Sequence, residues 1–240
     1  MDLQKIFSGN KKKLALLIDP DKTTAAAAAK LSVEAGKNGF QLILIGGSLV
    51  SEPLDQYIQT VKKSCKLPVV LFPGSLFQVS TKADGMLLLS LISGRNPEYL
   101  IGQHVLAAPV IKKMKLQTIS TGYILIEGGG TTSVEYMSNT KAIPANKTDI
   151  IKATALAGEM LGLKLIYLEA GSGAKNRVPS KVIREVKNVV SIPVIVGGGI
   201  STARDLKEVF AAGADMAVVG TAIENNAKLL KEFAEVVKRQ

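Results

Sequence analysis

Cysteine, histidine and tryptophan are almost absent from this 240-residue sequence, which contains one, one and none of them. The single cysteine, Cys65, excludes an internal disulfide framework and favours a reducing compartment. We interpret Cys65 as a small buried hydrophobic residue. No apolar run approaches the roughly 20 residues that span a bilayer. The short run after Lys13 ends at Asp19, which argues against a signal peptide, so we expect a cytoplasmic protein.

Acidic residues are outnumbered, with 20 aspartates and glutamates against 30 lysines and arginines, and the formal net charge is +10. A basic balance favours anionic partners. Nucleic acid is not expected, because aromatic residues make up only 5% of the chain and the lysines are scattered over predicted helices. Phosphorylated substrates, or peripheral contact with an anionic membrane that carries a lipid substrate, explain the charge. Most individual lysines also fit ordinary solvated helix faces.

Two glycine turns near the end of the chain organise the rest of the sequence. Residues 193–224 read as strand, glycine loop, helix, strand and second glycine turn, the size of one βαβ unit. Gly197, Gly198 and Gly199 follow one strand, and Gly220 with Thr221 follows the next. Bare main-chain amides at two neighbouring strand ends can hold a phosphate. The alternative is that the glycines only permit tight turns.

Eight short apolar runs alternate with segments of helical period along the whole chain. The runs do not alternate with polar residues, which is typical of strands buried on both faces of a parallel sheet. Together they predict a single-domain TIM (β/α)₈ barrel over residues 1–240. The predicted strands are residues 14–18, 42–45, 69–72, 86–89, 122–126, 165–168, 194–196 and 216–219.

Two connections depart from the regular barrel pattern. Residues 73–84 are too few and too rich in turn residues for a covering helix, so the barrel is predicted to lack a regular third helix. Residues 127–147 form a long stretch without an evident element. A structureless insert of that size in a compact domain suggests a lid or binding loop.

The chemistry of such a barrel is expected at the carboxyl ends of its strands. After the first strand, Asp19, Asp21 and Lys22 offer two carboxylates and a lysine, and carboxylates suit Mg²⁺. Asp21 can equally be an N-cap of the following helix. After the second strand, Gly46, Gly47 and Ser48 offer amides and a hydroxyl.

The sixth strand ends in the motif YLEAGSGA. Its Glu169 is the acid in that region that can act as a base on a bound alcohol. Ser172 and the amides around Gly171 and Gly173 can add to the phosphate site. His104 lies in a helix-like segment away from these residues, and we interpret it as structural.

Seven motifs along the sequence resemble those of a known protein family. LIDPDK, LIGGS, LSLISGRNPEYLIGQHV, GYILIEGG, IYLEAGSGA, VGGGI and VVGTAI, spread in order over residues 16–223, resemble the geranylgeranylglyceryl phosphate synthase family, which includes the bacterial heptaprenylglyceryl phosphate synthases. LIDPDK with YLEAGSGA looks more like the group shared by archaea and Bacteroidetes than the shorter bacterial group with YLEYSG. The family's fold, a TIM barrel without its third helix, agrees with the gap at residues 73–84.

The resemblance implies a Mg²⁺-dependent prenyltransferase. It would join the C3 hydroxyl of sn-glycerol 1-phosphate to a polyprenyl diphosphate, with geranylgeranyl as the expected chain, and release diphosphate. Asp19 and Ser48 match the family's metal positions, and Glu169 matches its proton acceptor. Lys22 would stabilise the leaving diphosphate. Tyr167 is expected to be a further catalytic residue. The implied substrate-binding residues are Tyr167, Leu168, Glu169, Ala170, Gly171, Ser172, Gly173, Gly198, Gly199, Gly220 and Thr221.

The resemblance leaves several points open. The shorter bacterial group has a phosphate-contacting lysine two residues before the first aspartate, where this chain has Leu17. The donor groove is expected across the barrel mouth, toward the side without a helix, and the family implies a homo-oligomer, either dimer or hexamer. Another phosphate-binding barrel enzyme, an isomerase or lyase, is the alternative. A basic barrel that binds lipid or nucleic acid without catalysis would leave Asp19, Ser48 and Glu169 unexplained.

Overall fold

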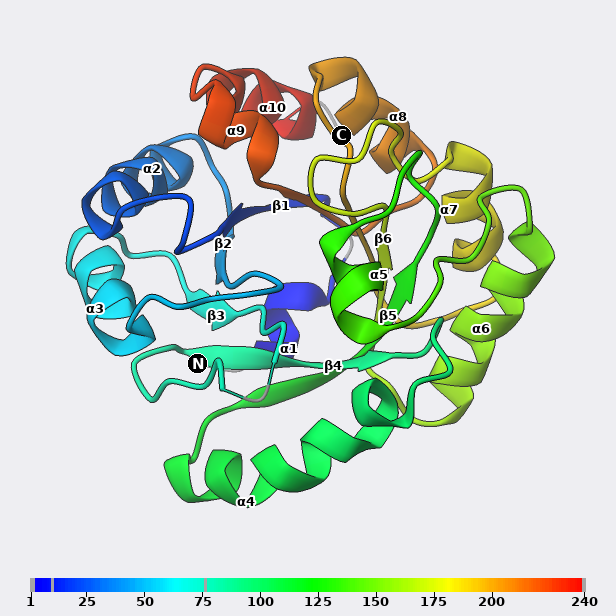
Figure 1. Cartoon of the computed structure of the whole chain (residues 1–240). Helices are drawn as coiled ribbons and strands as arrows, with labels where there is room; N and C mark the ends of the chain where they lie inside the picture. The colour runs from blue at the N-terminus through cyan, green and yellow to red at the C-terminus, as the bar shows by residue number, and fades with distance from the viewer. Residues whose placement is uncertain (1–2, 10, 76, 239–240) are drawn as a thin grey trace.

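Eight parallel strands close into a barrel in which each strand pairs with its neighbours in chain order and β8 pairs back to β1. The computed structural model describes residues 3–9, 11–75 and 77–238. Figure 1 looks into this barrel and confirms the predicted (β/α)₈ architecture. The strands are β1 (Lys13–Ile18), β2 (Leu42–Ile45), β3 (Val69–Leu71), β4 (Gly85–Leu91), β5 (Thr118–Leu125), β6 (Leu165–Glu169), β7 (Val194–Gly197) and β8 (Met216–Val219).

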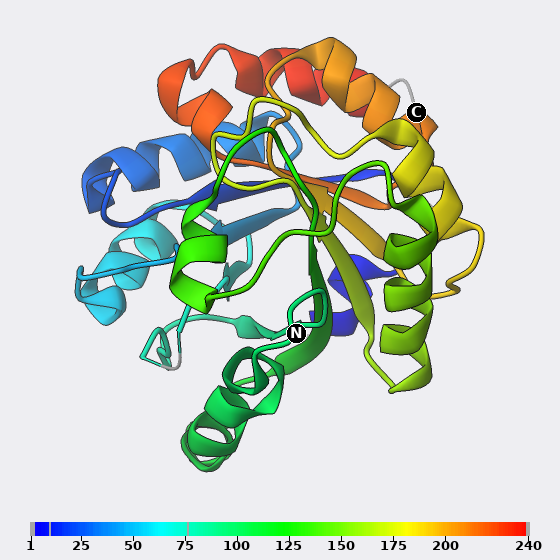
Figure 2. The ribbon, with the colours of Figure 1, turned by 45° about the vertical axis from the view of Figure 1, so that its right-hand side comes forward.

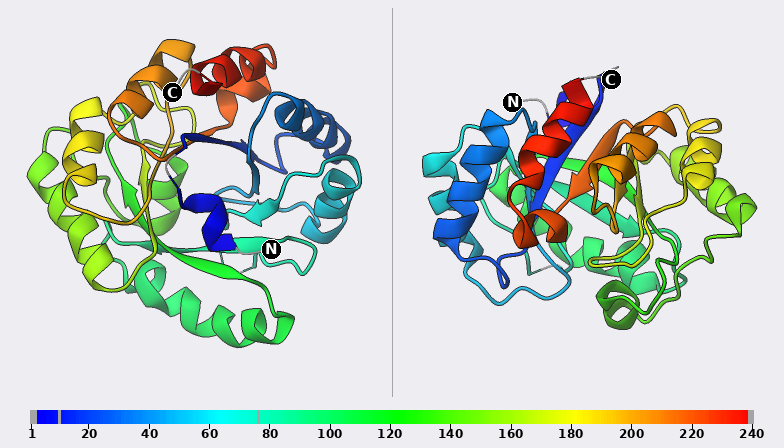
Figure 3. Two further views of the ribbon diagram at one scale, coloured as in Figure 1. Left: turned by 180° about the vertical axis from the view of Figure 1, so that it is seen from behind. Right: turned by 90° about the horizontal axis from the view of Figure 1, so that it is seen from above.

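Helices form an outer ring around the strands, and α1 instead lies across the amino-terminal end of the barrel (Figure 3). Leu3 and Phe7 of α1 are buried there against the barrel interior. Among the described residues, no helix combines the length and apolar character needed to cross a membrane. The helices are α1 (Leu3–Phe7), α2 (Ala25–Lys37), α3 (Leu54–Ser64), the π-helix η1 (Glu98–Gly102), α4 (Gln103–Met114), α5 (Ser133–Ser138), α6 (Thr148–Met160), α7 (Ser180–Lys187), α8 (Ala203–Ala211), α9 (Thr221–Asn225) and α10 (Leu229–Lys238).

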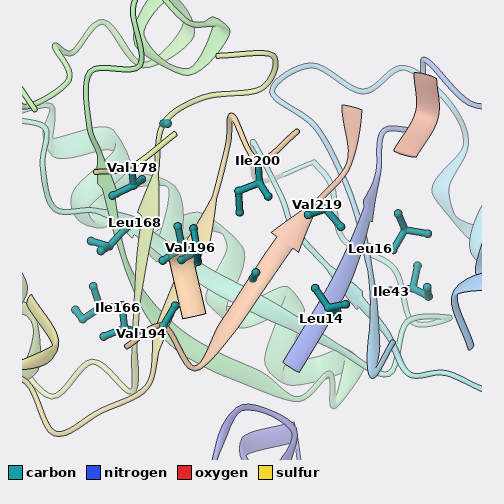
Figure 4. Packing of buried hydrophobic residues seen from close by; sticks show 14 of the residues in the cluster. Leu14, Leu16, Ile43, Ile166, Leu168, Val178, Val194, Val196, Ile200 and Val219 are labelled. Atoms are coloured by element: carbon teal, nitrogen blue, oxygen red, sulfur yellow. The ribbon is translucent and has the colours of Figure 1, made fainter. Parts of the chain in front are cut away.

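Each strand faces two apolar cores, because successive side chains of a strand point to opposite sides. Leu165 and Tyr167 of β6 point into the barrel, whereas Ile166 and Leu168 pack outward against the helix layer. Figure 4 shows part of the outer core, in which these two residues lie with Val196 of β7. Burial on both sides explains why the strands appear as uninterrupted apolar runs.

This alternation changes the role of two residues in the predicted substrate-binding segment. The side chains of Leu168 and Ala170 are fully buried in the outer core, away from the barrel mouth. Only their main-chain groups are left to face a substrate. Cys65 is buried as predicted, and its thiol lies 3.2 Å from the carbonyl oxygen of Ser32.

The connection between β3 and β4 has no helix among its described residues, as predicted from its length. Polar contacts hold it to the neighbouring loop instead. The buried Gln78 donates from Nε2 to the carbonyl oxygen of Gly47 at 2.8 Å and accepts from the amide of Gly74 at 3.2 Å. Because no helix fills this position, α3 and α4 are separated in the outer ring (Figure 1).

The stretch 127–147, predicted to lack structure, contains the short helix α5. Thr132 and Glu135 begin this helix with reciprocal hydrogen bonds, a capping box. Ile143 then forms a single parallel bridge with Ile126. The prediction of a structureless loop is therefore wrong, and Figure 2 shows the segment standing over one end of the barrel.

Aspartates just before β4 and β8 tie adjacent layers together in the same way. Asp84 accepts hydrogen bonds from the amide of Val69, the first residue of β3, at 2.9 Å and from Lys62 of α3 at 2.6 Å. Asp215 accepts from the amide of Val194, the first residue of β7, at 2.8 Å and from Lys187 of α7 at 2.6 Å. Each carboxylate thus satisfies a strand amide that its own sheet leaves unpaired.

Replacing Asp215 by alanine is expected to lower the free energy of unfolding by roughly 1–3 kcal/mol, because the amide of the buried Val194 loses its acceptor. Chemical denaturation measures this change. Glu34→Ala is the control, since Glu34 pairs only with Lys37 on an exposed surface and should cost less than about 1 kcal/mol. Equal losses in the two variants would contradict the role of Asp215.

Candidate active site at the barrel mouth

Residues predicted to carry the chemistry meet at the carboxyl ends of the strands. Asp19 follows β1, Ser48 follows β2, and Glu169 ends β6. Gly197 ends β7, and Gly220 follows β8. Since β8 pairs with β1, barrel closure brings the loops after the first and last strands side by side at the same mouth.

Glu169 is the one Asp, Glu, Lys, Arg or His side chain among the buried residues of the described chain, with 5% of its surface exposed. Its Oε1 accepts a hydrogen bond from the amide of Gly171 at 2.6 Å. Burial raises the pKa of Glu169 to about 7, although the Gly171 amide and the neighbouring Tyr167 hydroxyl oppose that shift. A carboxyl with this pKa accepts and returns a proton near neutral pH, as a general base must.

Tyr167 belongs to a cluster of three aromatic rings inside the barrel. Its ring centroid lies 5.4 Å from that of Tyr123 and 5.3 Å from that of Phe72. The Tyr167 hydroxyl is buried near Glu169 but falls short of hydrogen-bond geometry in this structure. Burial, followed by the charge of Glu169, raises the pKa of Tyr167 well above 10, so the phenol stays neutral. Tyr167 is therefore suited to orient Glu169 rather than to act as a base.

Sequence reasoning missed Phe72 and Tyr123 as site residues. Both were assigned to strands, and their aromatic character at strand positions was the available signal. Whether a strand residue points inward depends on the register of the closed barrel, in which Tyr123 pairs with Tyr167 across β5 and β6.

Gly197 and Gly198 leave the space that Glu169 and Tyr167 occupy. A Cβ atom on Gly197 would lie 2.3 Å from the Tyr167 hydroxyl and 2.9 Å from Oε2 of Glu169. A Cβ atom on Gly198 would lie 2.3 Å from Oε1 of Glu169, and the φ angle of Gly198 is +79°. These glycines therefore do more than permit a turn, because a side chain at either position would displace the acid.

The turns after β6, β7 and β8 converge beside this acid. The hydroxyls of Ser172 and Thr221 are 3.3 Å apart, which joins the first turn to the third. A Cβ atom on Gly198 would lie 2.7 Å from the amide nitrogen of Gly171, so the first two turns are also in contact. Amides and hydroxyls from three glycine-rich turns thus gather in one place, the arrangement that suits a phosphate.

Leu17 stands where the shorter bacterial group carries a lysine. Its side chain packs against the apolar barrel interior. The Gly220 turn approaches it so closely that a Cβ atom on Gly220 would lie 2.9 Å from the carbonyl oxygen of Leu17. Leu17 therefore packs against the Gly220 turn and provides no positive charge for a phosphate.

Asp19 and Ser48 lie on adjacent loops. A Cβ atom on Gly47 would be 3.1 Å from Cγ of Asp19, which places that carboxylate against the loop that continues into Ser48. Lys22 forms an ion pair with Asp19 at 2.9 Å. The backbone amide of Asp19 and the hydroxyl of Thr23 reach Oε1 of Glu224 at 3.5 and 3.4 Å, which links this loop to α9.

The Asp19 carboxylate and the Ser48 hydroxyl could fill only part of the coordination shell of a Mg²⁺ ion. Among residues 3–9, 11–75 and 77–238, no group of three or more His, Cys, Asp or Glu side chains is placed to hold a metal ion. One carboxylate and one hydroxyl match a Mg²⁺ ion that takes its remaining ligands from water and substrate phosphates. Asp19 and Ser48 are the residues that would hold it.

Asp21 has a different role from the predicted N-cap. Thr24 caps α2 by accepting from the amide of Ala27. Asp21 instead accepts from the amides of Ser51 and Glu52 at 3.0 and 3.1 Å, and these hydrogen bonds lower its pKa. It holds the β2–α3 loop rather than a helix end. The N-cap alternative failed because an aspartate near a helix start has the same local sequence whether it caps that helix or holds a neighbouring loop.

An apolar groove leads from Ser48 across the barrel mouth to the side without a helix. It passes over Phe72 and Tyr123 and runs between α4 and α5, with about 820 Å³ of empty space including its open mouth. The Tyr99 hydroxyl donates to the carbonyl oxygen of Met137 at 3.0 Å and connects η1 to α5 beside the groove. The lining residues are Gly47, Ser48, Phe72, Pro73, Gly74, Ser75, Met86, Leu88, Leu89, Leu91, Tyr99, Gln103, His104, Ala107, Tyr123, Val134, Met137 and Ser138.

His104, interpreted from sequence as structural, lies on the wall of this groove. Its Nε2 is 3.3 Å from the hydroxyl of Ser90. Burial lowers the pKa of His104, so the imidazole stays neutral among apolar neighbours. The groove was expected on this side of the barrel mouth, but His104 was not predicted to line it, because the walls come from separate elements.

Known proteins resemble this chain over nearly its full length. The model of the PcrB family matches residues 8–237. The chain is 52% identical to a geranylgeranylglyceryl phosphate synthase of Chitinophaga pinensis over 94% of this chain and 90% of that protein. It is 44% identical to one from Methanosphaera stadtmanae over 92% of each chain.

A solved structure gives the same result. The crystal structure of (S)-3-O-geranylgeranylglyceryl phosphate synthase from Thermoplasma acidophilum in complex with sn-glycerol-1-phosphate matches with a TM-score of 0.91 and 35% identity, covering 96% of this chain and 95% of that one. An N-acetylmannosamine-6-phosphate 2-epimerase from Clostridium perfringens matches at 0.60 with 16% identity over 98% and 96%, which supports the fold alone. On the family match and these identities, the chain belongs to the PcrB family.

Proposed function

We propose that this protein is a prenyltransferase that joins the C3 hydroxyl of sn-glycerol 1-phosphate to a polyprenyl diphosphate. The observation that carries the proposal is the position of Glu169, a buried acid with a pKa of about 7 beside three converging glycine turns. Relatives at 40–52% identity carry the name geranylgeranylglyceryl phosphate synthase. The Thermoplasma acidophilum relative binds sn-glycerol-1-phosphate, which supports the same acceptor here.

The acceptor's phosphate would be held by amides and hydroxyls of the turns after β6, β7 and β8, including Ser172 and Thr221. Anchoring the phosphate there leaves the far hydroxyl of glycerol to face Glu169. As the new C–O bond forms, the hydroxyl proton passes to Glu169. At the same time the C–O bond between the prenyl carbon and diphosphate breaks, and its electron pair leaves with the diphosphate.

The prenyl donor would lie in the apolar groove with its diphosphate near Ser48 and Asp19. Mg²⁺ bound by these two residues would supply charge neutralisation for the leaving diphosphate. Lys22, now paired with Asp19, can donate to the same leaving group. The faces of Phe72 and Tyr123 along the groove favour positive charge that develops on the allylic carbon.

The groove separates this proposal from its alternative. An isomerase or lyase acting on a small sugar or indole phosphate needs a phosphate site at the mouth but no apolar channel between α4 and α5. A geranylgeranyl donor, a homo-oligomeric state of two or six subunits and a cytoplasmic location stay predictions.

The reaction is tested by incubating the protein with labelled sn-glycerol 1-phosphate, Mg²⁺ and prenyl diphosphates of graded length, and then measuring label in an organic extract. We expect transfer from the geranylgeranyl donor and its loss on chelation of the metal. Asp19→Ala should need more Mg²⁺ for the same rate. Absence of labelled lipid with every donor would overturn the proposed function.

Glu169→Gln is expected to lower kcat by roughly 10²–10⁴-fold, because the amide cannot accept the hydroxyl proton. Equilibrium binding of glycerol phosphate should change little, since the turns that hold the phosphate remain. Glu127→Gln is the matched control, because Glu127 is an exposed acid after β5. Full activity in Glu169→Gln would refute the assigned role.

The pH dependence follows from the raised pKa of Glu169. The carboxyl is protonated below about pH 7, so kcat/KM should fall as pH decreases through that value, and Glu169→Gln should lack this inflection. The folded state also binds this proton more tightly than the unfolded state does. The stability from that proton is complete below the ordinary pKa of 4.5 and is lost as pH rises through about 7. Denaturation of both proteins at several pH values checks the sign.

A further inference from the structure

A polar cluster around Arg177 connects two of the glycine turns that converge beside Glu169. Arg177 lies in the loop between β6 and α7, and its side chain is only 15% exposed. From Nη1 its guanidinium donates to the carbonyl oxygen of Val178 at 2.9 Å and to the hydroxyl of Ser180 at 3.2 Å. Because Ser180 is the first residue of α7, these hydrogen bonds fix the end of the loop to the start of that helix.

The other side of the guanidinium reaches α8, the helix that follows the glycine turn after β7. Its Nη2 forms an ion pair with Glu208, and its Nε lies 3.5 Å from Oδ1 of Asp205. Helices α7 and α8 are neighbours in the outer ring (Figure 1). Arg177 therefore bridges the loop after β6 and the helix after β7, and most of its N–H donors are used in doing so.

Asp205 continues this connection to the end of the glycine turn. Its Oδ2 accepts hydrogen bonds from the amides of Ser201 and Thr202 at 3.3 and 2.9 Å. The hydroxyl of Thr202 accepts in turn from the amide of Asp205 at 3.1 Å, which completes the capping box of α8. Ser201 comes two positions after Gly199. The carboxylate that pairs with Arg177 thus also holds the chain just after the turn.

The main chains of the two turns are in direct contact at the same place. Gly199 has a φ angle of +68°, and a Cβ atom there would lie 2.7 Å from the amide nitrogen of Arg177 and 2.8 Å from its Cα. A Cβ atom on Gly198 would lie 2.7 Å from the amide nitrogen of Gly171, the same amide that donates to Glu169. The position of Arg177 therefore limits where both turns, and their amides, can lie.

We propose that Arg177 is a positioning residue for the phosphate of the acceptor, an inference that rests on the proposed function. Its guanidinium is directed at its own loop and at α8, so it acts through the turns and not by contact with the phosphate. A binding site made of loops holds its ligand tightly only when surrounding contacts fix it in the bound geometry beforehand. The ion pairs from Arg177 to α8 fix the turns after β6 and β7 in this way.

The test is calorimetric titration of the whole chain with sn-glycerol 1-phosphate in the absence of donor. Arg177→Gln should raise the Kd roughly 10–100-fold, because the turn amides lose their fixed spacing. In rate measurements the KM for sn-glycerol 1-phosphate should rise in the same proportion, whereas the KM for the prenyl donor should change little. Arg177→Lys should recover only part of the affinity, since an ammonium group cannot reach the same set of partners.

The matched control is Arg204→Gln. Arg204 belongs to α8 itself, pairs with the same Glu208 at 3.0 Å and is 88% exposed. Its replacement removes the same charge but keeps the link between the turns, so the Kd should match wild type. Glu208→Gln is a milder variant, which weakens the link to α8 and leaves the bonds of Arg177 within its own loop. It should raise the Kd in the same direction by a smaller factor, and it decides the question if Arg177→Gln does not fold.

An unchanged Kd in Glu208→Gln and in folded Arg177→Gln would overturn the proposal, as would an equal loss in Arg204→Gln. A lower Tm of Arg177→Gln with an unaltered Kd would also contradict it, because the guanidinium would then support the fold alone. Titration with inorganic phosphate separates this inference from the proposed function. If wild type transfers no prenyl group but its affinity for inorganic phosphate falls in Arg177→Gln and not in Arg204→Gln, the proposed function fails and the positioning role of Arg177 stands.

Discussion

The burial of one carboxyl group at the mouth of the barrel is the constraint on which the rest of the site depends. Glu169 is removed from water, and its main polar support is a single amide, that of Gly171. A charge in this position is costly, which is why its pKa lies near neutrality. The space around it is kept by Gly197 and Gly198, where a Cβ atom would collide with the acid or with Tyr167.

The missing helix has consequences on both sides of the sheet. In the outer ring it separates α3 from α4, and the connection that replaces the helix is held by the buried Gln78. Inside the mouth, the same region opens into the groove over Phe72 and Tyr123. The irregular connection thus also contributes Pro73, Gly74 and Ser75 to the lining of the apolar groove.

The strands and their order were predictable because each strand is buried on both faces, which leaves an apolar run in the sequence. The absent helix was predictable from the shortness and the turn-rich composition of residues 73–84. The error at α5 was avoidable, since Thr132 and Glu135 carry the spacing of a capping box. The role of Asp21 was not predictable, because Ser51 and Glu52 are its partners only once the β1 and β2 loops lie side by side.

The amino-acid sequence by itself determined the barrel, the glycine turns and the identity of the acid at Glu169, because local patterns and motifs encode strands, turns and chemical groups. Only the tertiary structure decided which side chains face inward, how Phe72 and Tyr123 join Tyr167, and where the groove runs. The physical reason is that these features depend on strand register and on contacts between segments far apart in the chain. Burial, and with it the pKa of Glu169, exists only once the barrel has closed.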